Sequence, residues 1–178
     1  MQDAADGFRI CRMNADEIAN LIAPLHAASW KTAYRGIMSD HFLDHVVDGE
    51  RRAHWRKKVE QLAAGDGEVF LARINDEPVG FLCIQGAESE ELNVHGAYVN
   101  NLHVLPHIKG QGLGTALLEY GAAWAKARGF SQMYLFVFED NLRARHFYRA
   151  NGWHAVERLM SELPGGELAA ELRLVKPI

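Results

Sequence analysis

The chain has 178 residues, of which 48 % are hydrophobic and 24 % are charged, and these values are ordinary for a globular protein. This length fits one domain better than two and suffices for a substantial core. The formal net charge of −4 provides no long-range attraction for nucleic acid or for an anionic membrane. The N-terminus lacks the features of a signal peptide, and no apolar run is long enough to span a bilayer. We therefore expect a cytoplasmic protein that forms a single domain over residues 1–178.

The first half of the chain has the pattern of a strand, two or three helices and a hairpin. Asn14 and Glu17 have the spacing of a helix-capping box, and apolar residues follow at helical spacing. The expected elements are a strand at Phe8–Met13, a helix from Asn14 towards Trp30, a short helix from Ser39, a charged amphipathic helix at Glu50–Ala64, and the hairpin strands Glu68–Ile74 and Val79–Ala87 joined by residues 75–78.

The second half alternates strands and helices. Its two helices are expected to end at Gly129 and Gly152, since glycine commonly follows the last helical residue. Together the two halves predict a mixed α/β or α+β sheet with helices on its faces. The expected elements are the strand Ala97–Val104, a helix from Leu113 to Ala127, the buried strand Met133–Phe138, a helix at Asn141–Asn151 capped by Asn141, and a second hairpin formed by Trp153–Leu163 and Leu168–Val175.

The most informative segment of the chain is Leu102–Thr115, which reads as a strand, a proline turn, three alternate glycines and the start of a helix. Such a junction directs backbone N–H groups and a positive helix end towards one point, which favours a phosphate-bearing ligand. A mononucleotide P-loop needs a lysine directly after its last glycine, whereas Thr115 follows Gly114 here. A dinucleotide fingerprint needs glycine at that same position, and an acidic residue about 20 positions later where this chain is apolar. A purely structural turn stays open as an alternative, although it would not require three glycines and a lysine.

Two motifs in order resemble the GNAT superfamily of acetyl-CoA-dependent N-acetyltransferases. The first is Leu102-x-Val104-x-Pro106-x-x-Lys109-Gly110-x-Gly112-x-Gly114-x-x-Leu117-Leu118, which is similar to the acyl-CoA-binding signature. The second is Asn141-x-x-Ala144-x-x-Phe147-Tyr148-x-x-x-Gly152-Trp153, which follows at the expected distance and after the expected strand. A third stretch, Trp30–Met38, resembles a segment between the first two helices of many members. The first motif alone is moderately specific, whereas the ordered pair is strong.

The resemblance implies a mixed sheet of about seven strands in which a parallel pair, Ala97–Val104 and Met133–Val137, splays apart to admit acetyl-CoA. Main-chain groups of the first strand would pair with the pantetheine arm, and the glycines would admit the pyrophosphate. Lys109 stands where the family usually has arginine or glutamine, so it keeps a charge but loses a planar fork. The implied cofactor-binding residues are Leu102, His103, Val104, Lys109, Gly110, Gln111, Gly112, Leu113, Gly114, Thr115, Asn141 and Tyr148.

The resemblance also implies that Tyr148 is the catalytic residue. It would face the thioester sulfur and donate a proton to the departing thiolate, since a phenol with a pKa near 10 is protonated at neutral pH. The general base is unassigned, because Ala97–Val104 lacks the acidic residue that many members carry there. The pKa of a histidine suits the task, but strand alternation directs His103 away from Leu102 and Val104. Glu88, Glu90 and Glu91 belong to an expected acidic loop near the site.

Two other chemistries fit the sequence poorly. Nothing near Cys83 in the sequence would activate its thiol as an acyl-carrying nucleophile, and both Cys11 and Cys83 lie in apolar runs that are typical of buried packing cysteines. His41 and His45 have the spacing to share a helical face, but there is no His-Glu-x-x-His motif and we expect no metal.

The leading hypothesis is therefore an N-acetyltransferase that transfers acetyl from acetyl-CoA to a primary amine by direct attack in a ternary complex. Trp30, Tyr34, Asn100 and Asn101 are candidates for the acceptor pocket. A non-catalytic acyl-CoA-binding or sensing protein is the main alternative, and an acetyltransferase of charged tRNA is disfavoured by the net acidity. The family often forms dimers, so a homodimer is possible. The acceptor, the general base, the acyl length and the oligomeric state are left open.

Overall fold

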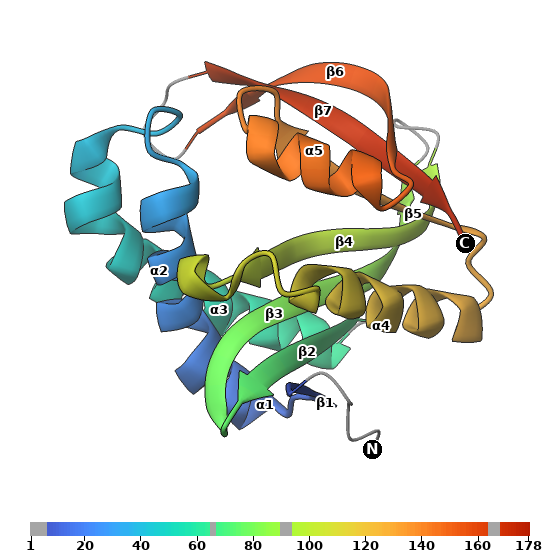
Figure 1. Cartoon of the computed structure of the whole chain (residues 1–178), viewed down its shortest axis with the longest axis horizontal. Coiled ribbons are helices and arrows are strands. Elements are labelled where there is room, and N and C mark those ends of the chain that lie inside the picture. Colours follow the sequence, from blue (N-terminus) through green and yellow to red (C-terminus); the bar gives the residue numbers. More distant parts are fainter. Residues whose placement is uncertain (1–6, 65–66, 90–93, 164–167) are drawn as a thin grey trace.

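A mixed seven-stranded sheet, with the order β1-β2-β3-β4-β5-β7-β6, runs through the computed structural model (Figure 1). The structure describes residues 7–64, 67–89, 94–163 and 168–178. All neighbouring strands are antiparallel except the central pair β4 and β5, which is parallel. The strands are β1 Arg9–Arg12, β2 Gly67–Ile74, β3 Glu77–Ser89, β4 Val94–Val104, β5 Gln132–Phe138, β6 His154–Glu162 and β7 Leu168–Pro177.

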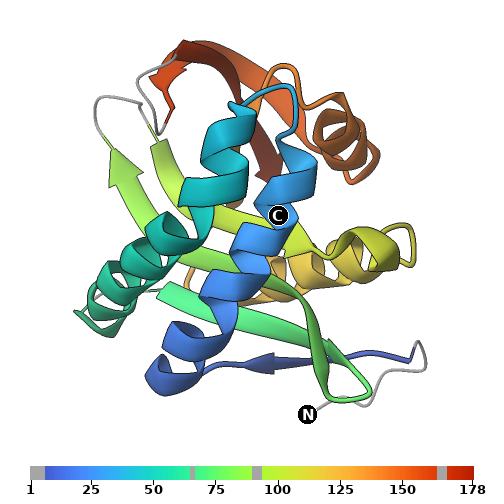
Figure 2. The same cartoon turned by 90° about the vertical axis from the view of Figure 1, so that its left-hand side faces the viewer.

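Helices cover both faces of this sheet, as the sequence predicts. One face carries α4 (Leu113–Ala127) and α5 (Leu142–Ala150), whose buried side chains join the main hydrophobic core. The other face carries the N-terminal helices, which lie in front of the sheet in Figure 2. They are α1 (Ala15–Glu17), a π-helical turn at Ile18–Ile22, α2 (Ala23–Ala33), a second π-helical turn at Phe42–Val46 and α3 (Val47–Ala64).

The two separate helices expected after residue 39 form one continuous helical segment, so that part of the prediction is wrong. Helical structure runs from Asp40 to Ala64. Its buried positions Leu43, Val47, Arg51 and Trp55 recur every four residues across the expected break. A side chain four residues further along lies on the same face of a helix. Burial of this single stripe therefore outweighs the low helix propensity of Gly49.

Local sequence signals are confirmed at the ends of several elements. Asn14 and Glu17 form a reciprocal capping box, in which Asn14 Oδ1 accepts from the backbone N–H of Glu17 at 3.0 Å. The first hairpin is tighter than the expected four-residue loop, because Asn75 and Asp76 alone form the turn with φ of 49° and 66°. These residue types tolerate a left-handed backbone. The corresponding loop of the second hairpin lies outside the described residues.

The acidic loop expected after the first hairpin is only partly testable. Glu88 belongs to β3 rather than to a loop, which corrects the prediction. Pairing with β4 continues to Ser89↔Val94, and this backbone ladder extends β3 beyond its apolar part. Glu90 and Glu91 lie outside the described residues.

A β-bulge interrupts the regular pairing of β4 with β3. Cys83 pairs with Asn101 and Ile84 pairs with Val99, so Asn100 is an extra residue on β4. The insertion shifts the alternation of side chains by one position. Val99 and Leu102, three residues apart, consequently contact the same core beneath α4.

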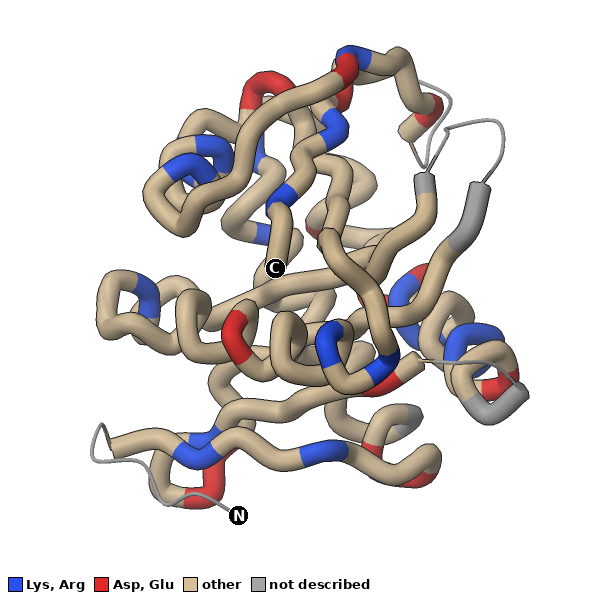
Figure 3. Tube along the Cα trace, turned by 90° about the vertical axis from the view of Figure 1, so that its right-hand side faces the viewer, with Lys and Arg blue, Asp and Glu red and all other residues tan. Residues whose placement is uncertain are grey.

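Positions of Lys and Arg alternate with positions of Asp and Glu along much of the trace in Figure 3. Helix α5 differs, since it carries three arginines and no acidic residue. Among the helices that the structure describes, none combines the length and the apolar character needed to cross a membrane.

Candidate active site

The parallel strands β4 and β5 diverge soon after the residues at which they pair. They pair only at Ala97↔Met133 and Tyr98↔Tyr134. Beyond Tyr98 the β5-facing backbone groups of β4 have no partner strand among the described residues. A cavity of about 830 Å³ opens at this point. Its walls come from α2, β4, β5, α5, β6, β7 and the segment Lys109–Gly114, which we call the glycine segment. The predicted splayed pair is thus confirmed, and it leaves room for an extended, amide-rich ligand.

The glycine segment ends at the cavity with a backbone that favours glycine. Gly110 has a φ of +88° and Gly112 a φ of +80°, both in the left-handed region. Gly112 is also the N-cap of the 15-residue helix α4, and it offers no side chain to the first N–H groups of that helix. Free N–H groups and the positive end of a helix attract an anion.

Two cations stand beside this segment. Lys109 and Arg143 both line the cavity, and the pKa of Lys109 is lowered by burial and then by the charge of Arg143. Neither forms an ion pair with a carboxylate among the residues that the structure describes. Two unpaired cations above an uncapped helix end are the surroundings that a pyrophosphate needs.

Gly114 has a different reason to be glycine. A Cβ there would lie 3.0 Å from Cζ of Phe147, which is closer than real Cβ contacts normally come. The residue therefore allows α4 to pack closely against the Phe147 ring of α5. This packing adds a second reason for glycine here, and the role of Gly114 in ligand approach stays a prediction, since Gly114 also lines the cavity.

Most of the predicted site residues meet at the cavity. Gln111, Gly112 and Thr115 do not line it, because they lie at the solvent side of the turn or within the first turn of α4. Those that do line it are Leu102, His103, Val104, Lys109, Gly110, Leu113, Gly114, Asn141 and Tyr148 from the donor set, with Trp30, Tyr34, Asn100 and Asn101 from the acceptor set.

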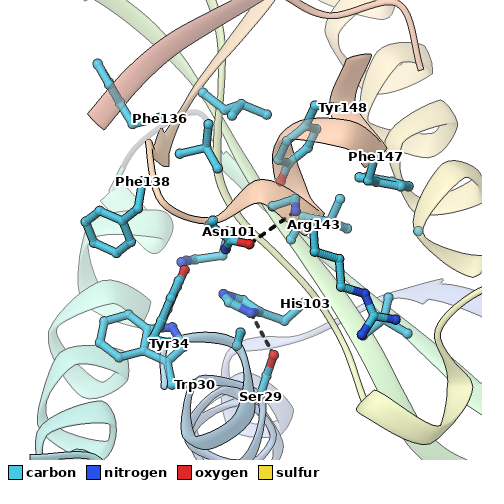
Figure 4. A pocket seen from close by; sticks show the side chains of 18 of the residues that line it. Ser29, Trp30, Tyr34, Asn101, His103, Phe136, Phe138, Arg143, Phe147 and Tyr148 are labelled. Carbon is cyan, nitrogen blue, oxygen red and sulfur yellow. Dashed lines mark hydrogen bonds between the residues drawn. The ribbon is translucent and has the colours of Figure 1, made fainter. Parts of the chain in front are cut away.

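Tyr148 lies on α5, with its ring against Trp153 and its hydroxyl directed into the cavity (Figure 4). Tyr34, the C-cap residue of α2, reaches the cavity from the opposite side, and its hydroxyl also points inward (Figure 4). Burial, and to a smaller extent Tyr34, raises the pKa of Tyr148 above its ordinary value. The phenol therefore stays protonated and available as a donor throughout the physiological pH range.

Asn141 combines two tasks. Its Oδ1 accepts a hydrogen bond from the backbone N–H of Ala144 at 3.1 Å, so the predicted N-cap of α5 is confirmed. The side chain also lines the cavity. Because an amide has a separate NH₂ group, the cap leaves its donor end free for a ligand.

His103 is unsuited to be a base. Its Nδ1 lies 2.9 Å from Oγ of Ser29 (Figure 4). Its ring packs against His26 and Phe81. The predicted orientation away from Leu102 and Val104 is confirmed, since those two residues contact the opposite core. Burial, and the charges of Lys109 and Arg51, lower the pKa of His103 to about 3. The expectation of a suitable pKa at this position is therefore wrong.

Sequence reasoning missed the acidic side of the cavity. Glu171 of β7 and Glu162 of β6 both line it, and Ser161 donates a hydrogen bond of 2.6 Å to Oε2 of Glu171. Aromatic side chains of Tyr98, Phe136 and Phe138 line the cavity as well. The only signal in the sequence is that Glu171 interrupts the otherwise apolar run Leu168–Leu172. No feature of the sequence of this run predicts that it pairs with β5.

Buried polar atoms without partners also mark the acceptor side. Trp30 Nε1 and Asn101 Oδ1 are buried and have no hydrogen-bond partner among the described residues. Both side chains line the cavity. Unsatisfied buried groups of this kind are uncommon in folded proteins, and a bound ligand can satisfy them.

The other chemistries considered from the sequence receive no support. Cys83 is fully buried in the core beneath α1–α3, and burial raises the pKa of its thiol to about 12, which leaves little thiolate for attack. His41 and His45 do share a face, with ring centroids 5.2 Å apart. Within the described residues they belong to no group of three or more potential metal ligands.

Known proteins share both the sequence and the fold. Residues 30–153 match the model of the acetyltransferase (GNAT) family. An uncharacterized N-acetyltransferase of Methanocaldococcus jannaschii is 28 % identical over 174 residues, covering 88 % of this chain and 73 % of that protein. An aminoglycoside N(6')-acetyltransferase type 1 of Stenotrophomonas maltophilia is 27 % identical over 145 residues, covering 77 % and 86 %.

A solved structure shows the same fold. The PaiA N-acetyltransferase of Thermoplasma acidophilum, crystallised in complex with coenzyme A, superposes with a TM-score of 0.73 at 17 % identity. The match covers 96 % of this chain and 99 % of that one. With the family match over residues 30–153, the parted parallel strands and the glycine segment at the cavity, the chain belongs to the GNAT family of acetyltransferases.

Proposed function

We propose that the protein, as a single catalytic domain over residues 1–178, transfers an acetyl group from acetyl-CoA to a primary amine by direct attack within a ternary complex. The observation that carries the proposal is the cavity between β4 and β5, because one end carries an anion-binding segment and the Tyr148 hydroxyl points into it. Family membership and the names of the relatives support the same reaction class.

The donor end fits acetyl-CoA by the chemistry of its groups. The β5-facing backbone groups of Leu102–Val104, which have no partner strand among the described residues, would bind the pantetheine amides in the manner of an added strand. Lys109, Arg143 and the N–H groups at the start of α4 would hold the pyrophosphate, and the free amide end of Asn141 would contact the pantetheine arm. The coenzyme A held by the structurally similar PaiA enzyme supports this assignment.

Tyr148 is the residue we assign to acid catalysis. Because its raised pKa keeps the phenol protonated, it can donate a proton to the thiolate that leaves. Attack also requires the acceptor nitrogen to be uncharged, so the amine loses a proton before or during the step, directly or through water. The cavity walls from α2 and β7 would position that nitrogen.

The acceptor is expected to be a small molecule that enters beside Trp30, Tyr34, Asn100 and Asn101, since all four line the cavity. The relative from Stenotrophomonas maltophilia is named for an aminoglycoside, which is a small molecule with several amino groups. A cytoplasmic location and a homodimer stay predictions.

The proposal is tested by measuring the melting temperature with and without millimolar acetyl-CoA, followed by acetylation of a panel of amines. A ligand that binds the folded state alone raises the melting temperature. We expect a rise with acetyl-CoA and release of free CoA thiol only when an amine is present. A rise without acetylation of any amine would instead indicate an acyl-CoA sensor. No rise at all would refute the assignment of the cavity.

A further inference from the structure

Glu171 is a carboxylate in the cavity wall that no cation of the described chain neutralises. It lies on β7 opposite Phe138 of β5, and it is partly buried. Its Oε2 accepts a hydrogen bond of 2.6 Å from Ser161 Oγ, which fixes the carboxylate but adds no charge. Withdrawing a carboxylate from water is unfavourable unless a positive group approaches it.

The surroundings of Glu171 suit an organic cation. Trp30, Tyr34 and Phe138 line the same part of the cavity, with ring centroids 5.1 Å apart for Trp30 and Tyr34, and 5.3 Å apart for Tyr34 and Phe138. Aromatic rings attract ammonium groups through their negative faces. The charge of Glu171 reaches this cluster, because burial first and Glu171 second raise the pKa of Tyr34 to about 12.

The positive side chains close to this cluster already have partners. Arg173, two residues from Glu171 on the same face of β7, pairs with Glu157. The guanidinium of Arg51 lies 4.0 Å over the Trp30 ring and pairs with Glu50. Arg51 is buried and does not line the cavity. Glu162 lines the cavity on the same side and adds a second negative charge. The acceptor side is therefore acidic, whereas the donor side is basic through Lys109 and Arg143.

We propose that Glu171 binds a second positive charge of the acceptor, so that the preferred substrate is a small amine carrying another ammonium or guanidinium group. The inference rests on the proposed transferase function and deepens it. Because the nitrogen that attacks must be uncharged, stabilising an ammonium at that same nitrogen would oppose the reaction. A carboxylate without a cation is better matched to a separate charged group, which it would hold while the first amine reacts.

The test compares 1,4-diaminobutane with pentylamine, which has nearly the same shape but lacks the second ammonium. Wild-type protein should show a kcat/KM at least about tenfold higher for the diamine, as expected for one charge-assisted contact. Glu171→Gln should remove most of this preference, mainly through a higher KM for the diamine. Glu119→Gln is the matched control, because Glu119 is an exposed carboxylate on α4 that does not line the cavity. Both variants should keep the wild-type shift in melting temperature with acetyl-CoA.

A titration of 1,4-diaminobutane without acetyl-CoA separates this inference from the proposed function. Diamine binding that is lost in Glu171→Gln supports the cation subsite even if no acetyl transfer is detected. Conversely, equal use of both amines by the wild type would overturn the inference while leaving the transferase intact. A preference for the diamine that survives Glu171→Gln would overturn it too, as would the absence of any diamine binding to the wild type.

Discussion

The Oγ of Ser29 on α2 and the Nδ1 of His103 on β4 lie 2.9 Å apart, and this contact joins the N-terminal helices to the wall of the cavity. His26 adds a second buried ring, with its centroid 4.4 Å from that of His103. Burial, with smaller contributions from neighbouring charges, lowers the pKa of both histidines. The pair is thus held uncharged in the folded protein.

This contact predicts that acid destabilises the protein. The unfolded chain protonates His103 near its ordinary pKa of 6.5, whereas the folded protein resists until about pH 3. The contribution of neutral His103 to the free energy of unfolding is therefore greatest above pH 6.5 and is lost as the pH falls towards 3. At pH 5 the free energy of unfolding should be lower by about 2 kcal/mol. Urea unfolding at several pH values between 7.5 and 5 measures the slope. His103→Gln should flatten it, whereas replacing the exposed His146 by Gln should not, and an unchanged slope in His103→Gln would contradict the assignment.

Removing the Tyr148 hydroxyl tests acid catalysis. Tyr148→Phe should lower kcat about 100-fold, in the range of general acid catalysis, while the affinity for acetyl-CoA changes little. Tyr134→Phe is the control, since Tyr134 is also buried but does not line the cavity. Turnover and acetyl-CoA titrations of both variants provide the comparison. A Tyr148→Phe protein that mainly fails to bind acetyl-CoA would show that the hydroxyl binds the donor instead.

The two cations beside the glycine segment should act on donor affinity alone. Lys109→Ala and Arg143→Ala should each weaken acetyl-CoA binding about three- to tenfold, and increasing salt should reduce the difference from wild type. Lys109→Arg should retain or improve the affinity, because a guanidinium can contact phosphate at two points. Arg149→Ala on the same helix is the control, because Arg149 is exposed and does not line the cavity. An equal loss of acetyl-CoA affinity in all three alanine variants would indicate a general effect of net charge and would contradict a specific role for Lys109 and Arg143.

Two glycines should respond oppositely to the same substitution. Gly114→Ala should destabilise the protein by about 1–3 kcal/mol, because the new methyl group meets the Phe147 ring. Gly49→Ala in α3 should stabilise it by up to about 1 kcal/mol, because its added Cβ would meet nothing within 4 Å. Thermal unfolding measures both. Adding Phe147→Leu should recover part of the loss at Gly114, and a fully additive double variant would contradict the proposed contact.

Local signals made much of the fold predictable. Asn14 and Asn141 cap their helices as expected, since a cap depends on residues three positions apart. The donor side of the site could also be predicted from the sequence, because Lys109, Gly110 and Tyr148 lie within two motifs that are each continuous in the chain.

The acceptor side of the site could not be predicted from the sequence in the same way. Glu171 enters the cavity because β7 is inserted between β5 and β6, an arrangement that depends on pairing across the whole sheet. The bulge at Asn100 is set by its partner strand β3, and strict alternation cannot anticipate it. His103 obtains its low pKa chiefly from burial, with smaller contributions from the charges of Lys109 and Arg51. Its hydrogen-bond partner Ser29 on α2 is 74 residues away in the chain.

The most direct measurement incubates the protein with acetyl-CoA carrying a deuterated acetyl group and with 1,4-diaminobutane, and follows both products by mass spectrometry. We predict that the labelled acetyl group appears on the amine in step with the release of CoA, and that Tyr148→Phe slows both together. Tight binding of acetyl-CoA with no labelled amine, from this diamine or from the wider panel, would contradict the central claim that the cavity between β4 and β5 is the site of acetyl transfer.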